Sequence, residues 1–354
     1  ALGQGDEARK AHAAALAICE RLVAAEPDRA DYKRDLAVSH DHMGDLFSAL
    51  GQGDDARKAF AAALAIRERL VAAEPDRADY KRDLSVSYNQ MGDLFRALGQ
   101  GDDARKAFAA ALAIREGLVA AEPDRADYQR DLSVSHDRMG DLFRALGQGD
   151  GARKAFAAAL AICERLVAAE PDRADYQRDL AVSHDRMGDL FRALGQGDEA
   201  RQAFAVALAI RERLVAVEPD RADYQRDLSV SHDRMGDLFR ALGQGDDASK
   251  AFAASLAIRE RLVAAEPNRA DYRRDLAVSQ SQMGDLYRAL GQGDEARQAY
   301  AAALAISERL VAAEPDRADY QRNLSVSYNK MGDVNRALGQ GDEARKAHAA
   351  ALAI

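Results

Sequence analysis

Three histidines, His136, His184 and His232, recur at one register of this sequence and suggest metal binding or proton transfer. Imidazole nitrogens bind metal ions at about 2 Å and exchange protons near neutral pH. Equivalent residues of stacked helices lie about 10 Å apart, however, so these rings cannot share one metal ion. We therefore interpret the histidines as partly buried packing residues and predict no metal site.

The two cysteines, Cys19 and Cys163, share another register three repeats apart. Stacked layers about 10 Å thick put them on the order of 30 Å from each other, which excludes a disulfide. Elsewhere arginine or serine fills this register: Arg67, Arg115, Arg211, Arg259 and Ser307. We expect this register to be exposed and to carry no fixed chemistry.

Catalytic groupings are missing from the sequence as well. No candidate nucleophile recurs beside a candidate base. The Gly-Gln-Gly-Asp turn at 147–150 has no following lysine and joins two helices, so it does not match a phosphate-binding loop. The sequence predicts no catalytic residue, no cofactor and no enzyme.

These registers exist because the chain repeats itself every 48 residues. Seven prolines mark the period: Pro27, Pro75, Pro123, Pro171, Pro219, Pro267 and Pro315. A fixed period of 20–50 residues is typical of solenoids, propellers or arrays. Within one period, apolar residues recur at helical spacing in two stretches, 124–146 and 150–170, and none alternates at strand spacing. We predict an all-α solenoid of antiparallel helix pairs.

Residues typical of turns and helix caps predict where each helix begins and ends. Asp124 and Asp150 are expected to cap the first and second helix of their repeat, and Gly147 to end the first in the left-handed conformation. Tyr128 and Met139 should be buried. Gly140, with a small residue at position 152, should let the paired helices approach closely.

One solenoid is predicted over 1–354. It comprises an unpaired helix in 1–27, six pairs at 28–75, 76–123, 124–171, 172–219, 220–267 and 268–315, and a truncated pair at 316–354. This gives fourteen helices of about 20 residues and a shorter fifteenth. The sequence starts without methionine and stops within a helix, so we interpret it as a fragment of a longer protein. The uncapped ends are expected to associate head to tail.

The repeat resembles the tetratricopeptide repeat. The matching positions are His136, Met139 with Gly140, Phe143, Ala152, Phe156 and Pro171. Spacing agrees as far as Phe156, but the period is 48 residues instead of 34 and the first aromatic position holds histidine. The repeat sequence is similar to that of the long-helix branch of this family, which includes kinesin light chain. The resemblance implies a right-handed superhelix with the first helices lining a concave groove that binds peptides.

The resemblance also implies site residues on the first helices. Asp137 lies about 200° around its helix from Met139 and shares a face with Arg130, Val134, Asp141 and Arg144. The family's groove positions therefore match these residues and their equivalents. The predicted partner-binding residues are Arg130, Val134, Asp137, Asp141, Arg144, Arg178, Asp185, Asp189, Arg192, Arg226, Asp233, Asp237 and Arg240. The family's carboxylate clamp is not reproduced, and a solvated face of self-paired charges is the alternative.

The amino-acid composition excludes some classes of binding partner. The net charge is −9 with 31% charged residues, which argues against nucleic acid. No apolar run is long enough for a membrane span, and sparse cysteine fits a reducing compartment, so we expect a cytoplasmic protein. The predicted function is a non-enzymatic scaffold that binds an extended peptide or partner helix of basic character. The alternative is a structural spacer or self-associating rod. The resemblance further suggests the sensory arm of a larger signalling protein.

Overall fold

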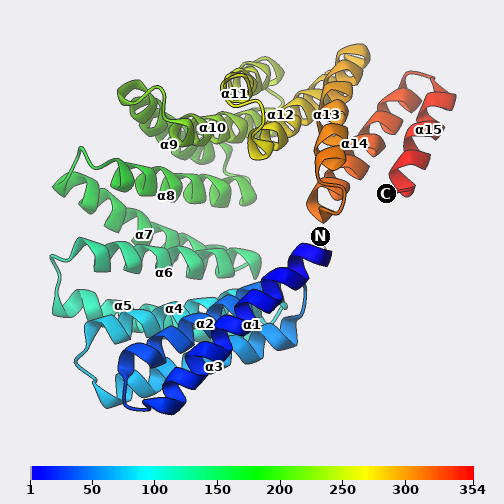
Figure 1. Cartoon of the computed structure of the whole chain (residues 1–354). Coiled ribbons are helices and arrows are strands. Elements are labelled where there is room, and N and C mark those ends of the chain that lie inside the picture. Colours follow the sequence, from blue (N-terminus) through cyan, green and yellow to red (C-terminus); the bar gives the residue numbers. More distant parts are fainter. Residues whose placement is uncertain (1) are drawn as a thin grey trace. The chain divides into compact units, whose positions relative to one another are not determined.

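The computed structural model describes residues 2–354, with side chains from Glu7 onward, and the regular structure in that range is entirely α-helical (Figure 1). After α1 (Leu2–Ala25), the first helices of the repeats are α2 (Ala30–Ala49), α4 (Ala78–Ala97), α6 (Ala126–Ala145), α8 (Ala174–Ala193), α10 (Ala222–Ala241), α12 (Ala270–Ala289) and α14 (Ala318–Ala337). The second helices are α3 (Gly53–Ala73), α5 (Gly101–Ala121), α7 (Gly149–Ala169), α9 (Gly197–Val217), α11 (Gly245–Ala265), α13 (Gly293–Ala313) and the shorter α15 (Gly341–Leu352). The predicted all-α architecture and helix lengths are confirmed.

First helices begin at an arginine, not at the predicted aspartate. Arg125 holds the N-cap position of α6, and its guanidinium donates hydrogen bonds of 3.0 and 2.8 Å to Asp127 in the first turn. The same guanidinium lies 4.1 Å from the Tyr128 ring centroid. The prediction that Asp124 caps this helix is wrong, because the arginine bridge and the cation–π contact fix the chain at the helix start.

Second helices begin earlier than predicted. Gln148 is the N-cap of α7, Gly149 is its first residue, and Asp150 lies in the first turn, where a carboxylate faces the positive end of the helix dipole. The prediction that Asp150 is the cap is therefore wrong by two residues. Gly147 has φ 69°, so its left-handed conformation is confirmed.

The helices form two compact units, residues 2–190 and 191–354. Inside each unit, consecutive helices pack as antiparallel pairs, α1 to α7 in the first and α9 to α15 in the second. The continuous solenoid over 1–354 and its right-handed twist span both units and stay predictions. None of the helices in residues 2–354 is long and apolar enough to cross a membrane.

Each layer of the core draws on three successive helices. One cluster consists of Ala104 and Phe108 of α5, Met139 and Leu142 of α6, and Ala155 of α7. Tyr128 and Met139 are buried as predicted. Close approach of the paired helices depends on Gly140, because a Cβ there would lie 2.5 Å from Cε1 of Phe156.

Candidate functional site

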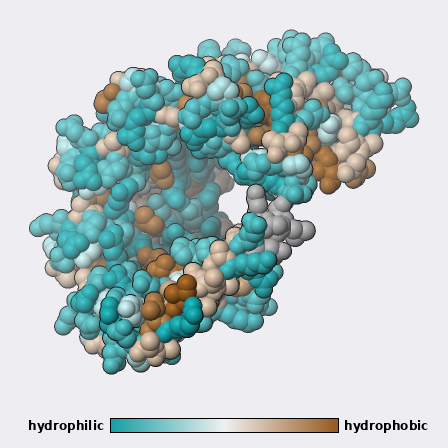
Figure 2. Space-filling view, viewed as in Figure 1, coloured by the Kyte–Doolittle hydropathy of each residue, from teal (hydrophilic) through white to brown (hydrophobic). Residues whose placement is uncertain are grey.

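The first helices of each unit share one surface, which we call the first-helix face. It is formed by α2, α4, α6 and α8 in residues 2–190 and by α10, α12 and α14 in residues 191–354. One valine per repeat lies on it with 37–47% of its surface exposed: Val38, Val86, Val134, Val182, Val230, Val278 and Val326. Exposed β-branched residues inside helices bring no benefit to helix stability. Figure 2 shows brown hydrophobic spots that interrupt a mostly hydrophilic surface.

Ion pairs connect neighbouring first helices. Arg34 of α2 contacts Asp79 at 3.1 Å and Asp83 at 2.7 Å, both on α4. The pattern recurs with the predicted site residues: Arg130 bonds to Asp175 and Asp179, and Arg226 to Asp271 and Asp275. These side chains are about one-third exposed, so each pair contributes only about 0–1 kcal/mol. Their main effect is to fix the spacing of adjacent first helices and to neutralise charge on the face.

Asp141 and Asp237 are also paired with arginines. Asp141 accepts a hydrogen bond of 3.2 Å from Arg144 and contacts Arg186 of the next first helix. Asp237 accepts one of 2.8 Å from Arg240. Burial raises the pKa of Asp237, and Arg240 opposes that rise.

The predicted residues of α8 differ in exposure. Arg192 is exposed, Arg178 and Asp189 are half-buried, and Asp185 is only 3% exposed.

Asp137 and its equivalents do not lie on an open surface. Asp137, Asp185 and Asp233 are each at most 9% exposed. Asp137 lies beside Arg186 of the next first helix, α8, and Asp233 lies beside Arg259 of the second helix of its repeat, α11. The residues therefore form the floor of the first-helix face, and Val134 with the charged pairs forms its surface.

The register of Cys163 is buried in the repeats from Arg67 to Ser307 and half-buried at Cys19, so the expectation that it is exposed is wrong. Arg67, Arg115, Arg211 and Arg259 are each 5% exposed, Cys163 is 2% exposed and Ser307 is 3% exposed. A buried guanidinium requires acceptors for its donors, and the neighbouring first helices supply them.

Arg259 shows how the guanidinium is held. It donates to Asp233 Oδ2 at 2.5 Å, Ser279 Oγ at 2.5 Å, the Asp275 carbonyl at 3.2 Å and Ser229 Oγ at 3.3 Å. These acceptors come from two first helices, so one arginine of a second helix joins α10 to α12.

Other repeats use the same arrangement. Arg67 bonds to Asp41 at 2.6 Å and also contacts Ser87. Arg115 donates to Ser85 Oγ, Ser135 Oγ and the Asp131 carbonyl.

The sequence carries a signal for this arrangement that our interpretation missed. Position 137 and position 163 lie 26 residues apart, as do their equivalents in the other repeats. Aspartate accompanies arginine in three repeats, as Asp41 with Arg67, Asp185 with Arg211, and Asp233 with Arg259. Serine occupies both positions at 281 and 307. The repeat with Asp137 and Cys163 is the one that keeps the aspartate and lacks the arginine.

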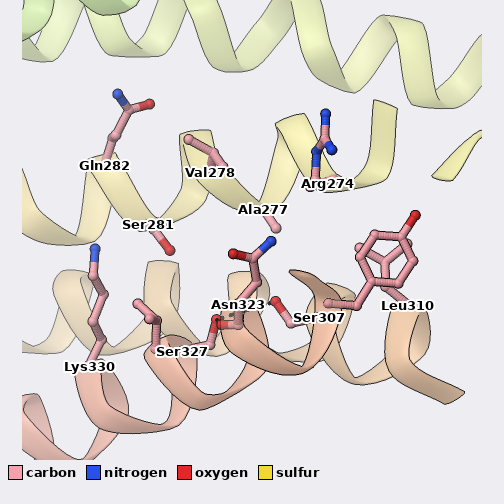
Figure 3. A pocket seen from close by; sticks show the side chains of 12 residues that line it. Arg274, Ala277, Val278, Ser281, Gln282, Ser307, Leu310, Asn323, Ser327 and Lys330 are labelled. Carbon is pink, nitrogen blue, oxygen red and sulfur yellow. Dashed lines mark hydrogen bonds between the residues drawn. The ribbon is translucent and has the colours of Figure 1, made fainter. Parts of the chain in front are cut away.

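Two pockets open on the first-helix face where the arginine is replaced. The Cys163 pocket has a volume of about 360 Å³ and lies among α4, α6, α7 and α8, with Val134 and Val182 at its edge. The Ser307 pocket has about 200 Å³ and lies among α12, α13 and α14, with Val278 and Val326 in its lining. Figure 3 shows the second pocket, with Ser281 on one first helix and Asn323 on the next.

The Cys163 pocket contains two buried titratable groups, the Asp137 carboxyl and the Cys163 thiol. Burial raises the pKa of Asp137 to about 7, although Arg186 Nε lies 3.2 Å from its Oδ2 and opposes the rise. Its other oxygen, Oδ1, is buried without a hydrogen-bond partner among the described residues. Burial also raises the pKa of the Cys163 thiol, which lies 3.4 Å from Ser183 Oγ. The thiol is therefore protonated at neutral pH and is a poor nucleophile.

The histidine register is half-buried, as predicted. His136, His184 and His232 are intermediate in exposure, and burial lowers the pKa of each. Within residues 2–354, no three histidine, cysteine, aspartate or glutamate side chains gather closely enough to hold a metal ion.

Comparisons with known proteins agree with this fold. One tetratricopeptide-repeat family model matches residues 275–337, and a second matches residues 84–122 and 180–220. No curated protein sequence matches the chain.

Among solved structures, BtubC (BKLC) from P. vanneervenii is 20% identical with a TM-score of 0.58, covering 75% of this chain and 94% of its own. The apo form of RapI is 13% identical with a TM-score of 0.52, covering 89% and 96%. Aspartyl phosphate phosphatase F from Bacillus subtilis is 13% identical with a TM-score of 0.53, covering 90% and 70%. At these identities the likeness concerns the fold alone.

Proposed function

Since the chain is built of tetratricopeptide repeats, we propose that it is a non-enzymatic scaffold whose first-helix face binds an extended peptide or a partner helix. Repeats of this family generally bind protein or peptide partners without catalysis. The observation that carries the proposal is the exposed valine at one register of every first helix, beside two pockets on the same face.

The valines provide repeated weak contacts. Burying apolar surface contributes about 25 cal/mol per Å², so each valine adds a modest amount and affinity comes from several together. A long partner laid across consecutive first helices meets one valine per repeat. The ion pairs between the helices hold this spacing before the partner arrives, which reduces the ordering that binding requires.

The predicted site residues have separate roles in this proposal. Val134 and its equivalents contact the partner's apolar groups. Asp141, Arg144 and Arg130 form a polar rim of paired charges, and Asp137 lies at the bottom of a pocket. The basic character of the partner rests on Asp137, a buried carboxylate in the repeat that has Cys163 where other repeats have arginine. We also keep the cytoplasm as the proposed location, because Cys19 and Cys163 are both free thiols.

A peptide array tests the proposal with matched variants. Val134→Gln and Val182→Gln together remove apolar contacts from the face without changing charge. Val206→Gln makes the same change on α9, at a valine of similar exposure, 39% against 41%, that is not on the face. We expect the double variant to bind array-selected peptides at least tenfold more weakly and the α9 variant to bind them as the parent does. Equal binding by all three proteins would rule out the first-helix face as the site.

A further inference from the structure

The Cys163 pocket repeats the acceptors that hold a buried guanidinium in another repeat, and Arg186 of the next first helix contacts only Asp137 among them. Four groups hold Arg259, namely the Asp233 carboxylate, the Ser229 and Ser279 hydroxyls and the Asp275 carbonyl. The residues at the same registers 96 positions earlier are Asp137, Ser133, Ser183 and Asp179, and all four line the Cys163 pocket. At the position of Arg259 itself stands Cys163, whose uncharged thiol contacts Ser183 among them, at 3.4 Å.

From this match, and resting on the proposed peptide-binding face, we propose that the Cys163 pocket binds the guanidinium group of an arginine side chain carried by the bound peptide. Asp137 is the principal acceptor. It is 8% exposed, and its only ion-pair partner among the described side chains is Arg186, which it shares with Asp141. A buried carboxylate is stabilised by each further charged donor that reaches it, as Arg259 reaches Asp233 Oδ2.

The other three aspartates of the pocket already have arginine partners. Its lining contains four aspartates, 93, 137, 141 and 179, and three arginines, 96, 138 and 186. Arg138 contacts Asp93, and Arg96 donates to the same residue at 3.2 Å. Arg186 contacts Asp141 as well as Asp137. Arg144 also pairs with Asp141, and Arg130 pairs with Asp179, so Asp137 is left with one contact, to an Arg186 that it shares with Asp141.

Guanidinium fits these acceptors better than ammonium does. Its five N–H donors lie in one plane and point outward in a fixed fork, whereas an ammonium carries three donors on one atom. The acceptors around Arg259 lie at 2.5–3.3 Å from three different nitrogens. A planar ligand can reach the same positions from the open side, between Val134 and Val182.

The Ser307 pocket is a natural comparison. It occupies the same registers three repeats later, but Ala277 replaces Ser133, Ser281 replaces Asp137 and Asn323 replaces Asp179 (Figure 3). It has no carboxylate at these positions. We therefore expect guanidinium binding at the Cys163 pocket and not at the Ser307 pocket.

Valine-methyl NMR of the full chain tests this with ethylguanidinium as the probe and ethylammonium as the matched cation. Val134 and Val182 report on the Cys163 pocket, while Val278 and Val326 report on the Ser307 pocket in the same spectrum. We expect saturable shifts of Val134 and Val182 with ethylguanidinium and at least tenfold weaker binding of ethylammonium. Shifts of equal size at all four valines, or equal affinity for both cations, would overturn the proposal.

Two variants locate the bound group. Cys163→Arg fills the pocket with the residue found at four equivalent registers, and we expect it to abolish the shifts. Ser307→Arg changes the other pocket and should leave them as they are. If Cys163→Arg does not fold, Asp137→Asn serves instead and should weaken ethylguanidinium binding at least tenfold. Retained binding in a folded Cys163→Arg or in Asp137→Asn would contradict the assignment.

The peptide array separates this inference from the proposed function. Peptides that bind the first-helix face equally well after every arginine is replaced by lysine would refute the arginine site and leave the binding face in place. Ethylguanidinium binding without binding of any array peptide would refute the binding face, and with it the peptide origin of the guanidinium.

Discussion

Replacing Asp137 with asparagine should stabilise the protein at pH 8 and much less at pH 5. Burial raises the pKa of this carboxyl from 3.8 to about 7. The folded state therefore holds a proton that the unfolded state has lost between about pH 4 and pH 7, and the stability of the parent falls as the pH rises through that window. Asparagine has nearly the same shape, stays neutral, and occupies the equivalent buried position as Asn89.

The size of the effect follows from the two pKa values. A difference of about three pKa units at about 1.4 kcal/mol each gives an upper bound of about 4 kcal/mol at pH 8. The pKa of about 7 already includes the attraction of Arg186, and asparagine leaves this guanidinium beside a neutral group, so we expect a net gain of about 1–3 kcal/mol. Lowering the pH from 8 to 5 should remove about 2–3 kcal/mol of this cost of burying a charged Asp137 in the parent. At pH 5 residue 137 is neutral in the folded parent, as it is in the folded variant.

Thermal unfolding followed by circular dichroism measures the difference. For a unit of this size, 1 kcal/mol shifts the midpoint by about 2–4 °C, so the gain at pH 8 is readily detected. Asp124→Asn is the matched control, since it removes the same charge from an exposed position and should show no such pH dependence. A change of midpoint for Asp137→Asn that is the same at pH 5 and pH 8 would refute the raised pKa and its cause.

Further substitutions test the packing and the buried arginines by the same measurement. Gly140→Ala should cost about 1–3 kcal/mol because its methyl group would meet a phenylalanine of the paired helix, whereas Gly117→Ala, at an open helical position, should gain up to about 1 kcal/mol; equal effects would contradict this account of the helix contact. Arg259→Ala should cost about 3–5 kcal/mol, because it leaves the Asp233 carboxylate buried without its guanidinium, while the exposed Arg261→Ala should change stability by less than about 0.5 kcal/mol. A loss at Arg259 no larger than at Arg261 would show that the buried pair does not hold the layers together.

Much of the fold could be predicted from the sequence because the period and the apolar stripes are local patterns. Helical spacing of Tyr128, Leu132 and Met139 fixes the buried side of the first helix, and Gly147 fixes its end. The cap residues were predicted wrongly because aspartate is a common cap, while the contact of Arg125 with Asp127 and Tyr128 depends on the conformation of the turn.

The candidate site was less accessible to sequence reasoning. Helical geometry places Asp137 opposite the buried Met139. In an isolated helix that would expose the Asp137 side chain to solvent. In the stack, a neighbouring first helix and a second helix cover that side, so Asp137 is buried. The Cys163 register was predicted to be exposed because arginine is usually a surface residue. Its burial depends on acceptors from neighbouring first helices, and the sequence points to them only through the residue pairs 26 positions apart, such as Asp233 with Arg259 and Ser281 with Ser307.

Photo-crosslinking tests the central claim, an extended partner on the first-helix face, most directly. Benzophenone side chains placed one at a time at Val86, Val134 and Val182 would be irradiated with an array-selected peptide, and the crosslinked peptide residues identified by mass spectrometry. The control position is Val206 on α9. We predict crosslinks from the three first-helix valines to successive parts of the peptide, in order along it, and none from Val206. Crosslinks from Val206 alone, or the same peptide residue captured at all three valines, would contradict an extended partner on this face.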